Sequence, residues 1–238
     1  METNVNMENF ADNGYNFDTF ITPLGRTVNL IFIKHGSIAI DIDGYLIYID
    51  PVSMFGNDFS ILPKAQMVLI THEHHDHLDP STIDLIKSDS TQIFSSARVA
   101  DIYNLAKPLA MGETHKVESA EFTVTTLPAY NTSPEHLNYH PKSRGDFGYM
   151  FYIDGLKIYV AGDTENIPEM AALGGKDVGI AFLPVNQPFT MTAEQAIHAV
   201  EMIQPQIVYP YHFGQTDLTP IVERFADSDI DIRIRALQ

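Results

Sequence analysis

The sequence predicts an α/β fold within a single domain, and three observations support this prediction. Runs rich in Val, Ile, Phe and Tyr fall into two groups, each of which begins with a β-hairpin. Segments with helical spacing alternate with the later strands of both groups. The 238 residues are 45% hydrophobic, which is enough for one large core. No repeat, low-complexity block or linker divides the chain.

The first group of strands begins with an antiparallel series. Its clearest signal is the dipeptide Asp43-Gly44, which is typical of a tight turn between two paired strands. The run 67–70 is apolar at every position, which suits a strand that is buried on both faces. The elements predicted in this half are strands at 28–33, 37–42, 45–49, 67–70, 92–94 and 121–127 and helices at 80–86 and 97–105.

The second group begins with another hairpin, whose turn is Asp154-Gly155. The clearest helix has Thr192 as its N-cap and Glu194 in its first turn, where a negative charge is favourable. The elements predicted in this half are strands at 147–153, 156–160, 178–183, 207–211 and 230–234 and helices at 168–173, 192–203 and 220–226.

Two segments carry no regular pattern. Residues 1–17 are polar and rich in Asn, Asp and Glu, so we expect a flexible tail before a single domain at 18–238. Residues 128–146 form a long polar loop that contains His136 and His140. Loops of this length in a compact domain are usually functional or disordered, so this loop is a candidate for part of a site.

The composition limits the chemistry and the partners. There are no cysteines, which excludes disulfides, thiolate ligands and a cysteine nucleophile. The formal net charge of -17 disfavours nucleic acid and anionic membrane surfaces, although bound cations would allow a small anionic substrate. No apolar run is long enough to span a membrane, and the first thirty residues show no signal-peptide pattern. We therefore expect a cytoplasmic protein that acts on a small molecule, with a homo-oligomer left open.

Metal-binding side chains are concentrated in the stretch His72–His77. Four His, one Asp and one Glu fall within six residues, directly after the apolar run that ends at Thr71. Imidazole and carboxylate groups suit divalent metals such as zinc. Further polar residues that follow predicted strands are Asp50, Asn131, Asp163 and His212. Ligands gather at the carboxyl ends of strands in α/β sheets, so these residues are candidate partners of the stretch.

The pattern Thr-His-x-His-x-Asp-His at 71–77 resembles the signature of the metallo-β-lactamase superfamily. Gly-Asp-Thr at 162–164 and Pro-Tyr-His-Phe-Gly at 210–214 follow in the order that this superfamily has. Other segments resemble its uncharacterised metal-dependent hydrolase branch, which includes ascorbate-6-phosphate lactonase-like proteins. These segments are Asp50-Pro51, Leu78-Asp79-Pro80, Pro128-Ala129-Tyr130-Asn131, His140-Pro141 and Phe189-Thr190-Met191-Thr192.

The resemblance implies a four-layer αββα sandwich, in which two mixed sheets are flanked by helices. It also implies two divalent metal ions, with zinc expected and manganese or iron as alternatives. The implied ligands are His72 and His74 for the first metal, Asp76, His77 and His212 for the second, and Asp163 for both. Asp76 would in addition accept a hydrogen bond from metal-bound hydroxide and pass on a proton.

One position departs from the family pattern. The superfamily usually supplies a third histidine for the first metal in a Pro-Ala-x-His context, and Asn131 stands there instead. We expect His140, in the same loop, to replace it. The alternatives are weak ligation by Asn131 or an incomplete first site, and His136 is a less favoured substitute. His75 is expected to be an exposed spacer between ligands.

Several residues are expected around the ligands. Asp50 either orients a ligand histidine or caps a turn. Tyr130 is expected in a pocket wall, and His35 either lines the pocket or is satisfied by backbone groups. Arg144 and Lys142 either meet an anionic group of the substrate or are ordinary surface charges.

The sequence thus predicts a metal-dependent hydrolase that uses metal-bound hydroxide on a small ester, lactone, phosphodiester or amide. A non-catalytic metal-binding protein is one alternative, which the departure at Asn131 keeps open. A diiron oxidoreductase on the same fold is another, but such proteins place Glu where His74 stands. A true β-lactamase and an RNA-processing enzyme are disfavoured.

Overall fold

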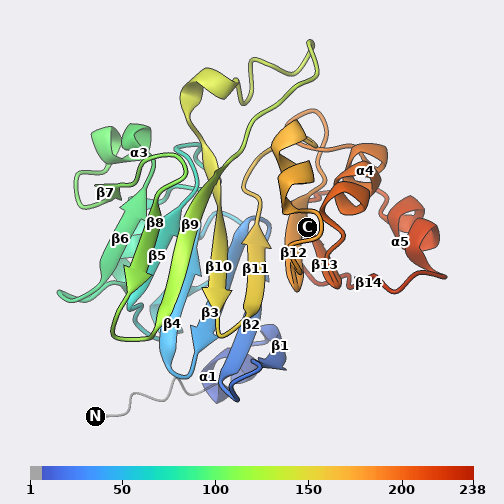
Figure 1. Ribbon diagram of the computed structural model, residues 1–238. Helices are drawn as coiled ribbons and strands as arrows, with labels where there is room; N and C mark the ends of the chain where they lie inside the picture. Colours follow the sequence, from blue (N-terminus) through green and yellow to red (C-terminus); the bar gives the residue numbers. More distant parts are fainter. Residues whose placement is uncertain (1–6) are drawn as a thin grey trace.

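The computed structural model describes residues 7–238, and these form two seven-stranded sheets packed face to face (Figure 1). Both sheets run in chain order from one edge to the other. The first sheet consists of β1 (Asn16–Ile21), β2 (Thr27–Lys34), β3 (Ser37–Ile42), β4 (Tyr45–Ile49), β5 (Met67–Ile70), β6 (Gln92–Ser95) and β7 (Lys107–Pro108). The second sheet consists of β8 (Thr114–Val117), β9 (Phe122–Pro128), β10 (Phe147–Ile153), β11 (Leu156–Val160), β12 (Ile180–Pro184), β13 (Ile207–Tyr211) and β14 (Asp231–Ile232).

Helices cover both outer faces of the pair of sheets. The helices on the first sheet are α1 (Glu8–Asp12), the 3-10 helix η1 (Phe59–Ile61), α2 (Pro80–Ile86) and α3 (Ala97–Ile102). The helices on the second sheet are the 3-10 helix η3 (Pro168–Leu173), α4 (Ala193–Ile203) and α5 (Thr219–Phe225). A further 3-10 helix, η2 (Lys142–Arg144), lies in the loop between β9 and β10. This arrangement confirms the predicted four-layer αββα sandwich.

Each sheet has an antiparallel half and a parallel half. Strands β1 to β4 pair antiparallel, whereas β4 to β7 pair parallel. In the second sheet, strands β8 to β11 pair antiparallel, and strands β11 to β14 pair parallel. Because parallel neighbours place their carboxyl ends together, the loops after these strands meet at one end of the sandwich.

The alternation of side chains along β10 shows how the layers are held together. Phe147, Tyr149 and Phe151 point into the core between the two sheets, whereas Met150 packs under the outer helices. This is the two-residue period of a strand that is buried on both faces. The core between the sheets therefore fixes the position of one sheet relative to the other. It also fixes the positions of the loops at their ends.

Helix α4 forms largely as the sequence predicts. Thr192 accepts a hydrogen bond from the backbone N–H of Gln195, and the Gln195 side chain accepts one from the backbone N–H of Thr192. This reciprocal capping box satisfies two backbone donors at the start of the helix. Ala196, Ala199 and Ile203 are buried on its inner face, spaced as a helix requires.

The predicted flexible tail at 1–17 needs correction. Residues 1–6 lie outside the described residues, but Glu8 begins α1 and Asn16 begins β1. Phe10 is fully buried against the first sheet. The sequence does not reveal β1 because its side chains remain half-exposed and its pairing to β2 depends on backbone hydrogen bonds. The tail prediction is therefore wrong for residues 8–17.

Other differences are small. The short strands β7 and β8 are not predicted, and the helix at 168–173 is a 3-10 helix. Among residues 7–238, no helix is both long enough and apolar enough to cross a membrane.

Candidate metal centre

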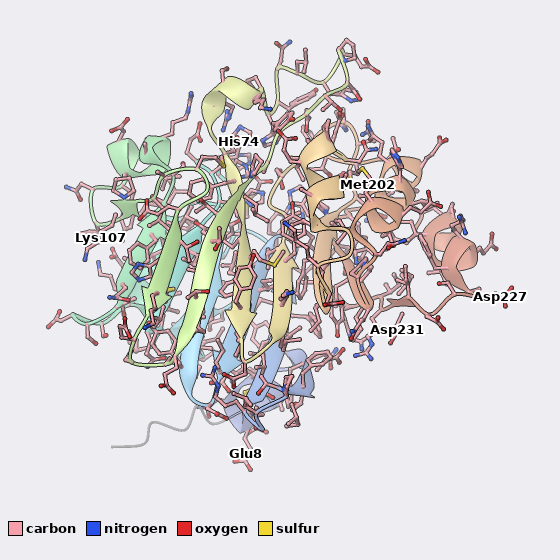
Figure 2. All side chains as sticks on the ribbon, in the orientation of Figure 1. Glu8, His74, Lys107, Met202, Asp227 and Asp231 are labelled. Carbon is pink, nitrogen blue, oxygen red and sulfur yellow. The ribbon has the colours of Figure 1, made fainter. Side chains whose placement is uncertain are left out.

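The predicted metal ligands meet at one end of the sandwich. His72 lies just beyond β5, Asp163 just beyond β11, and His212 directly after β13. Figure 2 shows His74 at this end, beneath the loop that joins β9 to β10 and that rises above the sheets in Figure 1. The topology therefore brings together side chains that are up to 140 positions apart in the chain (72 to 212).

Within residues 7–238, three groups of side chains could each hold a metal ion. In each group the candidate ligand atoms all lie within 4.8 Å of one another. The groups are His72, His74 and His140, then His72, His77 and Asp163, and then His35, Asp76 and His212. Every ligand that the sequence predicts belongs to one of these groups. His75 belongs to none, and its side chain is 85% exposed, as expected for a spacer.

His140 reaches the cluster from the loop between β9 and β10. Its ring centroid lies 4.9 Å from that of His72 and 4.7 Å from that of His74. Its Nε2 lies 3.4 Å from Asp163 Oδ2, and its Nδ1 lies 3.4 Å from Asp146 Oδ2. The structure thus places His140 where the missing third histidine is needed, and its role as a ligand stays a prediction.

Asn131 holds the loop that carries His140 and belongs to none of the three groups. Its backbone N–H donates to the carbonyl oxygen of His140 at 2.7 Å. Its side-chain amide donates to the carbonyl oxygens of His136 and Phe189, at 3.2 and 2.9 Å. These bonds use its nitrogen atoms to hold the loop. Its side-chain oxygen, the atom that would bind a metal, is buried and has no hydrogen-bond partner within the described residues, so weak ligation by Asn131 stays a prediction.

His136 also has a different partner. Its Nδ1 lies 3.4 Å from Oε1 of the buried Glu165. The other carboxylate oxygen of Glu165 accepts hydrogen bonds from the backbone N–H groups of Thr132 and Ser133, each at 2.7 Å. Glu165 therefore holds the start of the loop, and His136 lies with it outside the three groups.

Asp50 contacts His77, and the orienting role that was predicted for it stays a prediction. The fully buried carboxylate accepts hydrogen bonds from the Thr71 backbone N–H at 2.8 Å and from the Thr71 hydroxyl at 2.6 Å. His77 Nδ1 lies 2.8 Å from the same carboxylate, which leaves Nε2 to face Asp163 Oδ1 at 3.4 Å. A carboxylate behind a ligand imidazole fixes its tautomer and its direction.

Burial and charge set the protonation of the cluster. Burial, with the neighbouring imidazole of His77, holds the pKa of His72 well below its usual value. Burial and the nearby His140 lower the pKa of His74 to about 4. Both imidazoles are therefore neutral at pH 7, which is the form that binds metal.

For His77 and Asp163, by contrast, the surroundings favour the charged form. Burial disfavours charge on both groups, but the Asp163 and Asp50 carboxylates raise the pKa of His77 well above its usual value. For Asp163, the imidazoles of His212 and His77 outweigh burial and lower its pKa well below its usual value. Asp163 is thus a buried carboxylate at the centre of the cluster.

His35 lies closer to the cluster than the sequence suggests. Its Nε2 is 3.4 Å from Asp76 Oδ2, the same separation as for His212 Nε2. His35 has a positive φ of 53°, and its carbonyl oxygen accepts a hydrogen bond from the His212 N–H. A Cβ at Gly36 would lie 2.9 Å from the His77 ring, so only glycine fits there. The one sequence signal was the place of His35 directly after a strand.

Three residues predicted near the pocket bond to carboxylates of the protein. Tyr130 does not line the cleft, contrary to expectation, because its hydroxyl donates to Glu169 at 2.7 Å. Lys142 contacts the same Glu169 at 2.8 Å. Arg144 lies 2.8 Å from both Glu73 and Asp146, so it joins the His72–His77 stretch to the carboxylate beside His140.

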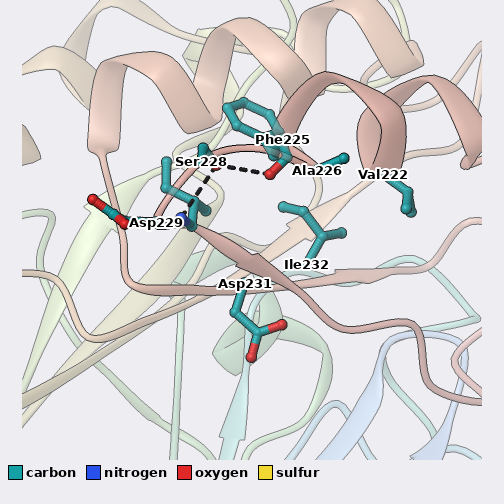
Figure 3. A pocket seen from close by; sticks show the side chains of 8 residues that line it. Val222, Phe225, Ala226, Ser228, Asp229, Asp231 and Ile232 are labelled. Atoms are coloured by element: carbon teal, nitrogen blue, oxygen red, sulfur yellow. Dashed lines mark hydrogen bonds between the residues drawn. The ribbon is translucent and has the colours of Figure 1, made fainter.

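The cluster opens into a cleft of about 420 Å³. Five of the candidate ligands, together with His35, line its inner part, and the remaining walls are His75, Met54, Phe55, Tyr139, Asn186 and Phe189. A second hollow of about 330 Å³ lies between α5 and β14 (Figure 3). Its Ser228 hydroxyl donates to the Phe225 carbonyl and accepts from the Ile230 N–H, and no histidine lines it.

Comparison with known proteins identifies the family of the chain. Residues 29–212 match the profile of the β-lactamase superfamily domain. The chain belongs to this superfamily. A relative from Lysinibacillus sphaericus, a UPF0173 metal-dependent hydrolase, is 30% identical over 192 residues that cover 76% of this chain and 82% of the relative. The predicted resemblance to the superfamily is confirmed, whereas the finer resemblance to ascorbate-6-phosphate lactonase-like proteins stays a prediction.

The chain is similar to many solved structures, of which two are described. One, from Parabacteroides distasonis, is described provisionally as a metal-dependent hydrolase; it is 44% identical, has a TM-score of 0.89 and covers 94% of this chain and 100% of its own. The other is CmlA, a diiron β-hydroxylase from Streptomyces venezuelae, with 18% identity and a TM-score of 0.69 over 88% of this chain and 53% of its own. At that identity, the second similarity shows the β-lactamase superfamily fold alone.

Proposed function

We propose that this chain is a hydrolase that depends on two divalent metal ions, with zinc as the first candidate. The observation that carries the proposal is the position of Asp163. Its Oδ1 lies 3.4 Å from His77 Nε2, and its Oδ2 lies 3.4 Å from His140 Nε2. Oδ2 also lies 3.6 Å from His212 Nε2, so this one buried carboxylate faces imidazoles of all three groups, as a residue shared between two ions would.

The residues present fit such ions. His77 Nε2 and Asp163 Oδ1 are buried and have no hydrogen-bond partner within the described residues, although they are close. A buried polar atom without a partner costs about 1–3 kcal/mol. Two ligands at about 2.0–2.1 Å from one tetrahedral zinc ion lie about 3.3–3.4 Å apart. The separation of these two atoms suits ligands of a common ion.

Each proposed ion has its own set of side chains. The first set is His72, His74, His140 and Asp163, and the second is Asp76, His77, His212 and Asp163, with His35 as a further donor beside Asp76. When bound, the ions would supply Lewis-acid activation of a water molecule and of the substrate oxygen. All of these donors are nitrogen or oxygen atoms, which suits zinc, manganese and iron.

Asp76 is the residue that we assign to proton handling. It lines the cleft, and its side chain is 21% exposed. Burial opposes its ionisation, but hydrogen bonds to His212 and His35 outweigh burial and hold its pKa far below the usual value. An ionised carboxylate at this place can accept a hydrogen bond from the attacking water and orient it towards the substrate.

The test is a measurement of metal content together with hydrolysis. Purified protein would be stripped with a chelator, dialysed, and reloaded with zinc, manganese or iron before assay on ester, lactone, amide and phosphodiester substrates. We expect about two ions per chain and hydrolysis that is lost on stripping and restored on reloading. Two bound ions without hydrolysis of any substrate would instead support a non-catalytic metal-binding protein.

A diiron oxidoreductase has less support. His74 lies in the first ligand group, at the position where the predicted alternative requires Glu. An absorption spectrum of protein purified from iron-rich medium separates the two functions, because a redox-active iron centre would absorb in the visible range and a zinc centre would not.

A further inference from the structure

The walls of the cleft differ from those of a site that binds phosphate. No Lys or Arg lines the cleft within residues 7–238. The two nearest basic residues in the loop above it, Lys142 and Arg144, already contact carboxylates. Sites that select phosphate groups usually offer Arg, Lys or the N-terminus of a helix. Apart from bound metal and the imidazoles, the described residues that line this cleft offer no positively charged side chain to an anionic substrate.

Apolar side chains stand at the mouth of the cleft instead. Met54 is 52% exposed and Phe189 is 41% exposed, although both are large and hydrophobic. Phe189 packs edge-on against Tyr139, with ring centroids 5.0 Å apart, and Phe55 lies 4.2 Å from His35. Exposed apolar groups that border a cleft with convergent polar groups are typical of small-molecule sites.

Among the described residues, Asn186 is the one neutral amide that lines the cleft. Its backbone groups bond to Phe189 and Thr190, which fixes the turn after β12. The side-chain amide has no hydrogen-bond partner within the described residues, and it lines the cleft. An amide can donate to a carbonyl oxygen or accept from an N–H or O–H group, so it suits an uncharged polar group.

We propose that the substrate is an uncharged ester, lactone or amide whose acyl part carries an aromatic or branched apolar group. This inference rests on the proposed hydrolase function and narrows it. The apolar group would pack against Met54, Phe55 and Phe189, and Asn186 would bond to an uncharged polar group. Water adds its oxygen to the acyl carbon, the acyl C–O or C–N bond breaks, and the proton passes to the leaving oxygen or nitrogen.

The experiment compares matched substrates on the metal-loaded protein. The probes are 4-nitrophenyl acetate, 4-nitrophenyl phenylacetate, bis(4-nitrophenyl) phosphate and 4-nitrophenyl phosphate, which share one leaving group. We expect kcat/KM to rise about tenfold from the acetate to the phenylacetate ester, since apolar contact adds to binding. Both phosphate esters should be hydrolysed at least about a hundredfold more slowly than the phenylacetate ester.

Variants test the walls directly. Phe189→Ala should reduce kcat/KM for the phenylacetate ester about tenfold more than for the acetate ester. Asn186→Ala should reduce kcat/KM for both esters. Tyr152→Ala is the matched control, because this partly exposed tyrosine of β10 lies far from the cleft lining.

The outcomes separate this inference from the proposed function. Faster hydrolysis of either phosphate ester would overturn the substrate class and leave the hydrolase function standing. If no probe is hydrolysed, the hydrolase function is contradicted, and binding still tests the cleft. In that case, calorimetry on the metal-loaded protein should show phenylacetamide binding more tightly than inorganic phosphate, and the reverse order would overturn the inference.

Discussion

His140 Nε2 lies 3.4 Å from Asp163 Oδ2, although the two residues come from different loops of the second sheet. The contact places an imidazole from a long polar loop at the centre of a buried cluster. The loop is held there by hydrogen bonds from Asn131 and to Glu165. Asn131, which departs from the family pattern, thus holds the loop of His140, the residue predicted to replace the missing histidine.

Replacing His140 should remove one metal ion. We expect His140→Ala to bind about one zinc per chain where the wild type binds two, because the first set loses its third imidazole. The measurement is elemental analysis of protein reloaded with zinc and dialysed, with circular dichroism to show that the fold is retained. His75→Ala is the control, since His75 is exposed and belongs to no ligand group. Retention of two ions in the His140 variant would show that it is not a ligand.

Asp50 should control the affinity of the second metal. Asp50→Asn keeps the shape of the side chain but removes the charge that holds His77 Nδ1 at 2.8 Å. We expect zinc affinity to fall by about 10–100-fold, as is common when a carboxylate behind a ligand histidine is lost. Competition with a coloured chelator measures this. Asp43→Asn, at a turn position with positive φ that Asn tolerates, should leave the affinity unchanged. Equal affinity in both variants would argue against an orienting role.

Replacing His35 tests whether this residue binds a metal ion or only lines the cleft. If its Nε2 joins Asp76 and His212, then His35→Ala should weaken one of two cobalt ions and change the visible spectrum of the cobalt-substituted protein. Cobalt is a suitable probe because its absorption depends on the number and type of its ligands. His115→Ala, in which the removed ring contacts Phe94 in another part of the fold, is the control. An unchanged spectrum would restrict His35 to the wall of the cleft.

Asp18 should make the stability of the fold depend on pH. It lies 2.7 Å from Arg235, and it also accepts a hydrogen bond from Tyr209, which ties β1 to the C-terminal segment. Burial opposes its ionisation, but hydrogen bonds from Tyr209 and Arg235 outweigh burial and lower its pKa. Because the folded pKa lies below the unfolded value of about 3.9, the stabilisation is complete above that value and is lost as the pH falls through the folded pKa.

We therefore expect Asp18→Asn to lower the free energy of unfolding by about 1–2 kcal/mol at pH 7. Below about pH 4 this loss of stability should become progressively smaller. Urea denaturation at several pH values measures both quantities. Asp84→Asn, the control, removes the partner of Lys87, but the Asp84 side chain is 60% exposed and the change should cost less than about 0.5 kcal/mol. A cost for Asp18→Asn that does not change with pH would contradict this explanation.

The sequence allowed much of the fold to be predicted, because buried strands and capped helices are local patterns. Helix α4 and the hairpin of β10 and β11 lie within about two residues of their predicted bounds. By contrast, β1 has no hydrophobic alternation, and its stability depends on pairing with β2. The burial of Phe10 likewise depends on a surface that the first sheet provides, so neither could be found locally.

In the site, too, local patterns could be predicted from the sequence and long-range contacts could not. The stretch His72–His77 is visible because its ligands are adjacent in the chain. The approach of His35 depends on contact between two loops of different sheets, where its carbonyl oxygen meets the His212 N–H. The direction of Tyr130 towards Glu169 depends on packing around η3. Such contacts follow from the completed fold and leave no pattern in the sequence.

The most direct test of the metal centre is a crystal structure of the zinc-loaded protein, with anomalous scattering data collected at the zinc edge. The proposed arrangement predicts two peaks, both within ligand distance of Asp163. His140 Nε2 should lie about 2.0–2.1 Å from one of them, and His77 Nε2 should lie at the same distance from the other. A single peak, or two peaks of which neither contacts His140, would contradict it.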